Sequence, residues 1–337
     1  MRRHPGGLFV APLAWVLLFV IPWAGCKGCS QEPNSDEMVH LSRPEDAGEG
    51  SPSTALPENF ELGVADRGLL EFAGEMDLRN RYASTVMVSF NDAMEGPQCS
   101  GILVAPNLVL TAGSCVCSPT KDTKAGVEKK RLIDGSACAP QVFVTTVVTG
   151  VVRDMRWKED TTEMEFRAYR GTVRPHPRLN VVLDERSAVV FADADLAVIV
   201  LDKSVGGEVP EAQLARTEAQ PGEFLIMAGY AHEAGRGFGG VYGVRYFRKN
   251  LVTNHVTNGR GFYRQQGPYL WDGYTGGPCF REDANGQWLV GVASKKVGEE
   301  FVFTSVVSFR GWLDEELLNA QKRGASSIRG NIKGEKR

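Results

Sequence analysis

The chain has 337 residues, of which 42% are hydrophobic, so it is long enough to bury the core of one large β domain or two smaller ones. The net charge is only −3 and the basic residues are spread along the chain, which argues against the concentrated basic surface of a nucleic-acid-binding protein. The 38 glycines favour a fold with many turns. Seven cysteines are an odd number, so at least one is unpaired, modified or joined to another molecule.

Residues 1–26 have the composition of an export signal. Arg2 and Arg3 precede an uncharged, apolar stretch of about 17 residues, which is the order of charge and hydrophobicity in a signal peptide. The segment ends in Trp-Ala-Gly-Cys at Cys26, which resembles a bacterial lipobox, where the cysteine is lipidated and becomes the mature N-terminus. The alternative is an uncleaved anchor, because about 17 apolar residues is the lower limit for spanning a bilayer. Both alternatives predict an exported envelope protein held at a membrane, on the periplasmic or cell-surface side, in a compartment that permits disulfides. The lipobox alternative also predicts a lipid on Cys26.

Residues 27–60 predict a disordered linker between this anchor and a folded domain at 61–322. The linker is polar, rich in proline and acidic residues, and lacks apolar periodicity. Cys26 and Cys29 have the spacing of a metal or redox motif, but no second pair lies at a matching distance. No metal site and no cofactor are therefore predicted.

The first folded segments have the patterns of β-strands. Val86, Val88 and Phe90 alternate with smaller or polar residues, which predicts a half-buried strand. Two short apolar strands follow within 99–115, joined by a Pro-Asn turn. The segment 141–153 is rich in valine and threonine and is predicted to be a further strand.

The cysteines of the folded part suggest a partial disulfide pattern. The 99–115 hairpin places its chain ends side by side, so we expect a disulfide between Cys99 and Cys115. Cys117 and Cys138 bracket a lysine-rich loop and could pair with each other, although the sequence alone leaves the connectivity open. Cys279 has no assigned partner and is a candidate for a buried thiol.

The folded part resembles the chymotrypsin-like (trypsin-like) serine proteases from about residue 82 to residue 318. The hairpin is similar to the one that carries the catalytic histidine, and Trp-Asp-Gly-Tyr-Thr-Gly-Gly-Pro is similar to the nucleophile loop Gly-Asp-Ser-Gly-Gly-Pro. This resemblance implies an all-β fold of two six-stranded antiparallel barrels with a C-terminal helix. The similar segments, in the order of the family, are 99–115, 173–178 with 192–201, 223–230, 271–278, 288–294 and 301–313.

The same resemblance gives approximate boundaries within the domain. It places the first barrel at 82–203, the second at 204–308 and the closing helix at 306–322. An apolar stripe supports that helix, and residues 323–337 are expected to form a basic, disordered tail. The stripe consists of Phe309, Trp312, Leu313 and Leu317.

Carried over position by position, the catalytic triad of the family is substituted at two of its three positions. Ser114 stands at the base, Asp195 at the carboxylate and Thr275 at the nucleophile, and the N–H groups of Gly273 and Thr275 would form the oxyanion hole. A serine hydroxyl does not titrate near neutral pH, so Ser114 cannot act as a general base. Loss of the base costs on the order of 10⁶-fold in kcat in subtilisin. The methyl group of Thr275 also restricts its χ1 angle and crowds the attack on a carbonyl.

The surroundings of the triad depart from the family as well. Tyr269 falls at the floor of the substrate pocket, and the pocket edge reads Ser294-Lys295-Lys296 in place of Ser-Trp-Gly. A lysine in place of the glycine is expected to narrow the mouth of the pocket. Tyr274 replaces the aspartate that, in the family, pairs with the new N-terminus after activation. His176 falls on a surface loop of the family and is expected to be exposed.

Three hypotheses on function follow. The first is an exported, membrane-tethered, inactive trypsin-like homologue that holds a protein or peptide ligand in the cleft between its barrels. The alternative is an active serine-type endopeptidase-like hydrolase that uses Thr275 as nucleophile with an unidentified base. The third is an inhibitor or decoy that occupies the substrate of another protease. In the first hypothesis, Asp195 is a structural carboxylate and Thr275 a turn residue.

Overall fold

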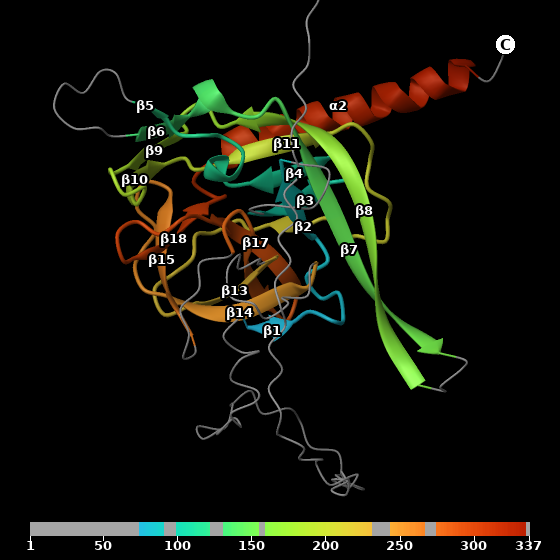
Figure 1. Ribbon diagram of the computed structural model, residues 1–337, viewed down its shortest axis with the longest axis horizontal. Helices are drawn as coiled ribbons and strands as arrows, with labels where there is room; N and C mark the ends of the chain where they lie inside the picture. The colour runs from blue at the N-terminus through green and yellow to red at the C-terminus, as the bar shows by residue number, and fades with distance from the viewer. Residues whose placement is uncertain are drawn as a thin grey trace, which may run out of the picture. The chain divides into compact units, whose positions relative to one another are not determined.

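The computed structural model describes residues 74–90, 99–121, 131–154, 159–230, 243–266 and 274–334 (Figure 1). In this part of the chain, no helix is both long and apolar enough to cross a bilayer. The predicted export signal, the linker and the lipidation site at Cys26 lie outside the described residues.

Six strands of the described residues close into a first barrel. Their order around it is β11-β4-β3-β2-β7-β8, and every neighbouring pair is antiparallel. Valine, isoleucine and leucine dominate the central strands, because branched side chains fit a pleated surface and fill a small barrel. The strands are β2 (Thr85–Ser89), β3 (Cys99–Ala105), β4 (Leu108–Thr111), β7 (Gln141–Asp154), β8 (Glu159–Pro175) and β11 (Ala197–Leu201).

Six further strands of the described residues form the second barrel, in the order β13-β14-β15-β18-β17-β16. The pairing of β13 with β16 closes the ring. Together the two barrels confirm the fold class that the sequence predicts. The strands are β13 (Phe224–Tyr230), β14 (Arg245–Val252), β15 (Arg260–Gln265), β16 (Pro278–Asp283), β17 (Gly286–Ala293) and β18 (Phe301–Ser305). Outside the ring, β1 (Glu75–Met76) pairs with β14, and β12 (Gln213–Leu214) pairs with β17.

The prediction of a half-buried strand near Val86 was wrong. All five residues of β2 are buried, because β2 turns one face into its own barrel and also packs against β13 of the second barrel. Polar positions of this strand therefore lie between the barrels and not in water. Only Phe90, just after the strand, is exposed.

Two β-structures were not expected from the sequence. A four-stranded sheet, β10-β9-β6-β5, is built from β5 (Thr120–Lys121), β6 (Arg131–Asp134), β9 (Asn180–Leu183) and β10 (Val189–Asp193). In addition, β7 and β8 stay paired from Gln141 to Asp154 and form a long ribbon that extends past the barrel (Figure 1).

The closing helix α2 (Arg310–Gly334) carries the predicted apolar stripe. Phe309, just before the helix, and Leu313 are buried, and Trp312 and Leu317 pack against the same core. The stripe thus fastens the first turns of α2 to the barrels.

The predicted bounds of this helix were wrong at both ends. Residues 306–309 form a turn, so the helix begins at Arg310, and it continues to Gly334 through most of the segment predicted to be a disordered tail. The segment 321–334 contains no proline to stop a helix, and its basic residues are favourable near a helix C-terminus.

Candidate functional site

Ser114 lies directly against Asp195. The end of β4 leads into a short 3₁₀ turn, η1 (Gly113–Cys115), which holds Ser114 in a buried position. Its backbone N–H donates to Oδ1 of Asp195 at 2.7 Å, and its hydroxyl donates to Oδ2 at 3.0 Å. The structure therefore brings the predicted base position and the predicted carboxylate together, with a hydroxyl where an imidazole would be needed.

Asp195 also receives a hydrogen bond from the second barrel. Ser294, which follows β17, donates its hydroxyl to Oδ2 of Asp195 at 2.6 Å. The Ser294 Oγ atom is also 3.4 Å from Oγ1 of Thr304 on β18. Since Asp195 is only 2% exposed, these contacts supply the hydrogen bonds that a buried carboxylate needs. Asp195 is thus a bridge between the barrels.

The nucleophile loop packs tightly on the first barrel. Ser100 of β3 donates its N–H to the carbonyl of Thr275 at 2.9 Å. The next residue, Gly276, has a φ of 83°, and a Cβ added there would lie 2.2 Å from the Ser100 carbonyl oxygen and 2.5 Å from Oγ1 of Thr111. Only glycine fits this approach. The loop therefore places Thr275, whose side chain is partly exposed, in the same region between the barrels as Ser114.

Tyr274, at the activation position, is buried in the second barrel. It is 1% exposed and packs over Gly229, where an added Cβ would lie 3.0 Å from the Tyr274 ring. Burial raises the pKa of its hydroxyl well above the usual range. A buried, neutral phenol cannot replace a carboxylate that would pair with a terminal ammonium group.

The N-terminal part of the domain is held by a different ion pair. Nε of Arg245 on β14 lies 2.7 Å from Oδ2 of Asp77, and both side chains are almost fully buried. Asp77 also accepts from the N–H groups of Arg81 and Tyr82, while Arg245 donates to the Val147 carbonyl. We refer to Asp77 and Arg245 as the N-terminal clamp. It fixes the loop after β1 to β14 of the second barrel.

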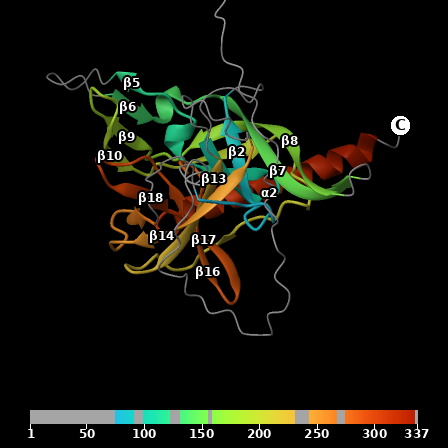
Figure 2. The same cartoon turned by 60° about the horizontal axis from the view of Figure 1, so that its bottom comes forward.

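The predicted pocket edge is partly occupied by the chain itself. Val189 of β10 forms a parallel bridge with Val297, and its carbonyl accepts from the N–H of Gly298 at 3.1 Å. Figure 2 shows β10 beside β18. Lys296 places its Nζ 4.9 Å from the ring centroid of Phe301 and 3.5 Å from a carboxylate oxygen of Glu299. The chain just beyond Ser294-Lys295-Lys296 is therefore already paired.

Comparison with known families decides the classification. The sequence model of the trypsin-like peptidase domain matches residues 99–292, which is more than half of the chain. The chain belongs to the trypsin-like peptidase family. Two similar solved structures are an inactivated protease paralogue, S-I1, of the scabies mite and neuropsin, a serine protease expressed in the limbic system of mouse brain. They share 17% and 15% identity, respectively, and each comparison covers 73% of this chain and 99% of the other, with a TM-score of 0.45. No curated protein sequence matches the chain.

Two histidines of this trypsin-like domain lie in the described part of the chain, and neither faces Asp195. His176, expected to be exposed, is only 7% exposed, because its ring packs edge-on against Phe309 and Trp312 at 5.0 and 4.7 Å. Its Nδ1 accepts from the N–H of Arg178, and burial lowers its pKa. His255 is exposed.

Several predicted site positions lie outside the described residues. They include Gly273, Tyr269 and Cys26, as well as His232, the one other histidine of the folded domain. The oxyanion hole and the pocket floor therefore stay predictions. Within the described ranges, no group of three or more histidine, cysteine and acidic side chains could hold a metal ion.

The cysteines agree with the predicted pattern. Cys99 is bonded to Cys115, and Cys117 is bonded to Cys138, which settles a pairing that the sequence left open. Cys279 is a buried free thiol, and burial raises its pKa, so it is a poor nucleophile at neutral pH.

Sequence reasoning did not assign the hydrogen bond from Ser294 to Asp195 or the pairing of Val189 with Val297. Ser294 was identified only as part of the pocket edge. One signal in the sequence does point to this contact. With a serine at position 114, the carboxylate of Asp195 has no imidazole beside it and needs hydrogen-bond donors from other residues.

Proposed function

We propose that this chain is an exported, membrane-tethered trypsin-like protease homologue that does not cleave peptides and instead binds a protein or peptide ligand between its barrels. The observation that carries the proposal is the set of donors around Asp195. In an active enzyme of this family, the carboxylate orients an imidazole that takes a proton from the nucleophile. Here Ser114 occupies that position, and both it and Ser294 donate to the same carboxylate oxygen.

A general base needs a group that binds a proton near neutral pH and lies within hydrogen-bond reach of the nucleophile. The hydroxyls of Ser114 and Ser294, which donate to Asp195, do not bind a proton near neutral pH. The Nδ1 atom of His176 accepts from the N–H of Arg178, and its ring packs against Phe309 and Trp312. The alternative of an active Thr275 requires another base. The partial exposure of Thr275 makes this alternative testable with a chemical probe.

A fluorophosphonate probe tests whether Thr275 is activated. We expect no covalent labelling of the full-length protein above that of the matched variant Thr275→Ala, measured by intact mass spectrometry beside an active trypsin as positive control. Stoichiometric labelling that is lost in Thr275→Ala would contradict inactivity and support the hydrolase alternative.

A second variant asks whether the substituted positions are the only obstacle to catalysis. Restoring both residues in Ser114→His/Thr275→Ser should give weak peptidase activity at most, because Lys296 and the paired Val297 still limit access to the pocket edge. Vigorous cleavage of a peptide library by this variant would show that the cleft is open and that the pocket assignment is wrong.

The proposed membrane tether rests on the sequence of residues 1–26 and is tested separately. We expect wild-type protein expressed in bacteria to incorporate labelled palmitate and to sediment with membranes, whereas Cys26→Ala loses the label because the acceptor thiol is gone. Membrane association without any label would favour an uncleaved anchor. The second cysteine, Cys29, provides a matched control in Cys29→Ala, which should keep the label.

A further inference from the structure

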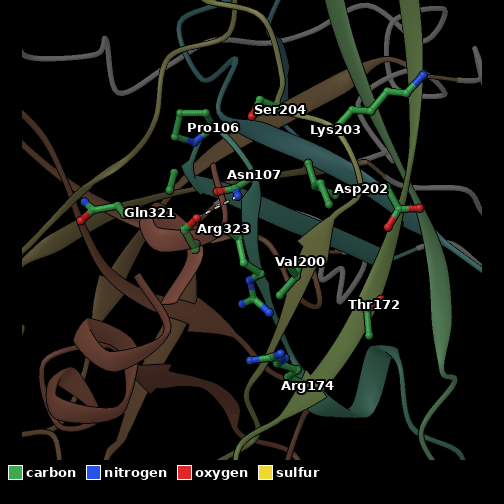
Figure 3. Close-up of a pocket in the computed structure, with 13 residues that line it drawn as sticks. Pro106, Asn107, Thr172, Arg174, Val200, Asp202, Lys203, Ser204, Gln321 and Arg323 are labelled. Carbon is green, nitrogen blue, oxygen red and sulfur yellow. Dashed lines mark hydrogen bonds between the residues drawn. The ribbon is translucent and has the colours of Figure 1, made fainter. Parts of the chain in front are cut away.

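A cavity lies away from the inter-barrel site, where α2 runs beside the first barrel (Figure 3). Its volume is about 870 Å³, within the range of small-molecule sites in proteins. The turn between β3 and β4, the strands β8 and β11, the residues after β11, and the α2 segment 320–323 form its walls. It shares no lining residue with the inter-barrel site, so nothing below depends on the proposed function.

Arg323 is the least satisfied polar side chain of this cavity. Its Nε and Nη2 atoms are shielded from solvent, and neither has a hydrogen-bond partner. These two nitrogens form the edge of the guanidinium that matches the two oxygens of a carboxylate. Leaving such donors unpaired costs free energy, which an acceptor bound at this edge would recover.

The charges around the cavity favour an anion with a single charge. Arg174, Lys203 and Arg323 line it, together with one acid, Asp202. Arg174 is in turn paired with Glu316 at 3.4 Å. Three basic and two acidic groups leave one positive charge. In Figure 3, Arg174 and Arg323 extend toward the part of the cavity beside Val200, whereas Asp202 and Lys203 extend toward another side.

The remaining wall is largely apolar. Pro106, Val200 and Leu201 line the cavity together with two alanines, and the carbonyl of one of these, Ala320, is already bonded to Asn107. We propose that this cavity binds a small organic monocarboxylate, with the apolar body against Val200 and Leu201 and the carboxylate on Arg323. The long arginine side chain already lines the cavity, and a change in its torsions turns the unpaired edge toward the bound acid.

The test uses the full-length protein and 4-phenylbutyrate as the probe. Titration calorimetry should show saturable binding, and the Nε–Hε signal of Arg323 in a ¹⁵N-labelled sample should shift during the same titration. Arg323→Gln removes both donors of the edge and should weaken binding by about tenfold or more. Lys322→Gln, which removes a charge from the neighbouring exposed side chain, is the matched control and should bind like wild type.

Two other ligands test whether the cavity prefers a carboxylate, and one more variant tests whether the bidentate contact matters beyond the charge of Arg323. The neutral 4-phenylbutanamide should not bind measurably, and phenyl phosphate, which is doubly charged at pH 8, should bind more weakly than the acid. Arg323→Lys keeps the positive charge but loses the two parallel donors of the guanidinium, so its affinity should lie between those of Arg323→Gln and the wild type. Absence of binding to wild type, equal binding to Arg323→Gln, or equal losses in Lys322→Gln would each overturn the proposal. So would full recovery in Arg323→Lys, or tighter binding of the phosphate or the amide.

Discussion

At the scale of single residues, a carboxylate can be kept in a protein interior by more than one set of donors. Asp195 is satisfied by the backbone N–H of Ser114 and by the hydroxyls of Ser114 and Ser294. These donors are small and neutral, and neither a serine hydroxyl nor a backbone N–H titrates near pH 7. An aspartate at this position can therefore stabilise the packing of the two barrels when a serine, and not a histidine, stands at position 114.

His176 makes the stability of the protein depend on pH. Burial lowers its pKa below the usual value of about 6.5, so the unfolded chain binds a proton more readily than the folded one. The free energy of unfolding should therefore fall as the pH drops below about 6.5, and the contribution should be complete above it. Urea unfolding between pH 8 and pH 5 should show this loss in wild type and a smaller loss in His176→Asn, whose amide oxygen can still accept from Arg178.

The exposed His255 provides the control for this measurement. His255→Asn removes a histidine from a solvent-facing position and should keep the wild-type pH dependence. An unchanged dependence in His176→Asn would show that other groups, such as the ion pair between Arg178 and Asp193 beside the ring, account for the effect.

At the scale of elements, the N-terminal clamp ties the loop after β1 into the domain. The clamp joins the loop after β1 to β14, and Arg245 also donates to Tyr230 of β13 and to the carbonyl of Val147 on β7. A single guanidinium thereby ties the start of the domain to both barrels.

Breaking the clamp should destabilise the domain strongly. Arg245→Met leaves the Asp77 carboxylate buried without its charged partner, which typically costs about 3–5 kcal/mol. The same change at Arg81, which pairs with Glu282 but is largely exposed, should cost less than about 1 kcal/mol. Urea unfolding of both variants measures the difference. Similar, small losses in the two variants would show that the clamp contributes little.

At the scale of the whole molecule, the resemblance to the trypsin-like proteases predicted the fold class, and local patterns predicted single strands and the hairpin. Long-range contacts supplied the rest. The 99–115 hairpin is visible in the sequence because its apolar runs, turn and cysteines are neighbours. The contact of Ser294 with Asp195 joins residues 99 positions apart, and no local pattern reports it. His176 was placed wrongly for the same reason, since its burial depends on Phe309 and Trp312 of the closing segment.

The ribbon of β7 and β8 has a consequence for how copies of this protein behave toward one another. The outer edge of β7 is occupied as far as Thr149, whose N–H and carbonyl bond to Asn80. Beyond Thr149, and on β8 before Arg170, the backbone pairing of the described residues runs between these two strands, so their outer edges offer backbone groups to a passing chain. Glu163, Glu165, Arg167 and Arg170 place charges along β8, and such charges hinder the edge-to-edge pairing from which fibrous aggregates grow. We therefore expect solubility at high concentration to depend on these few surface charges of β8.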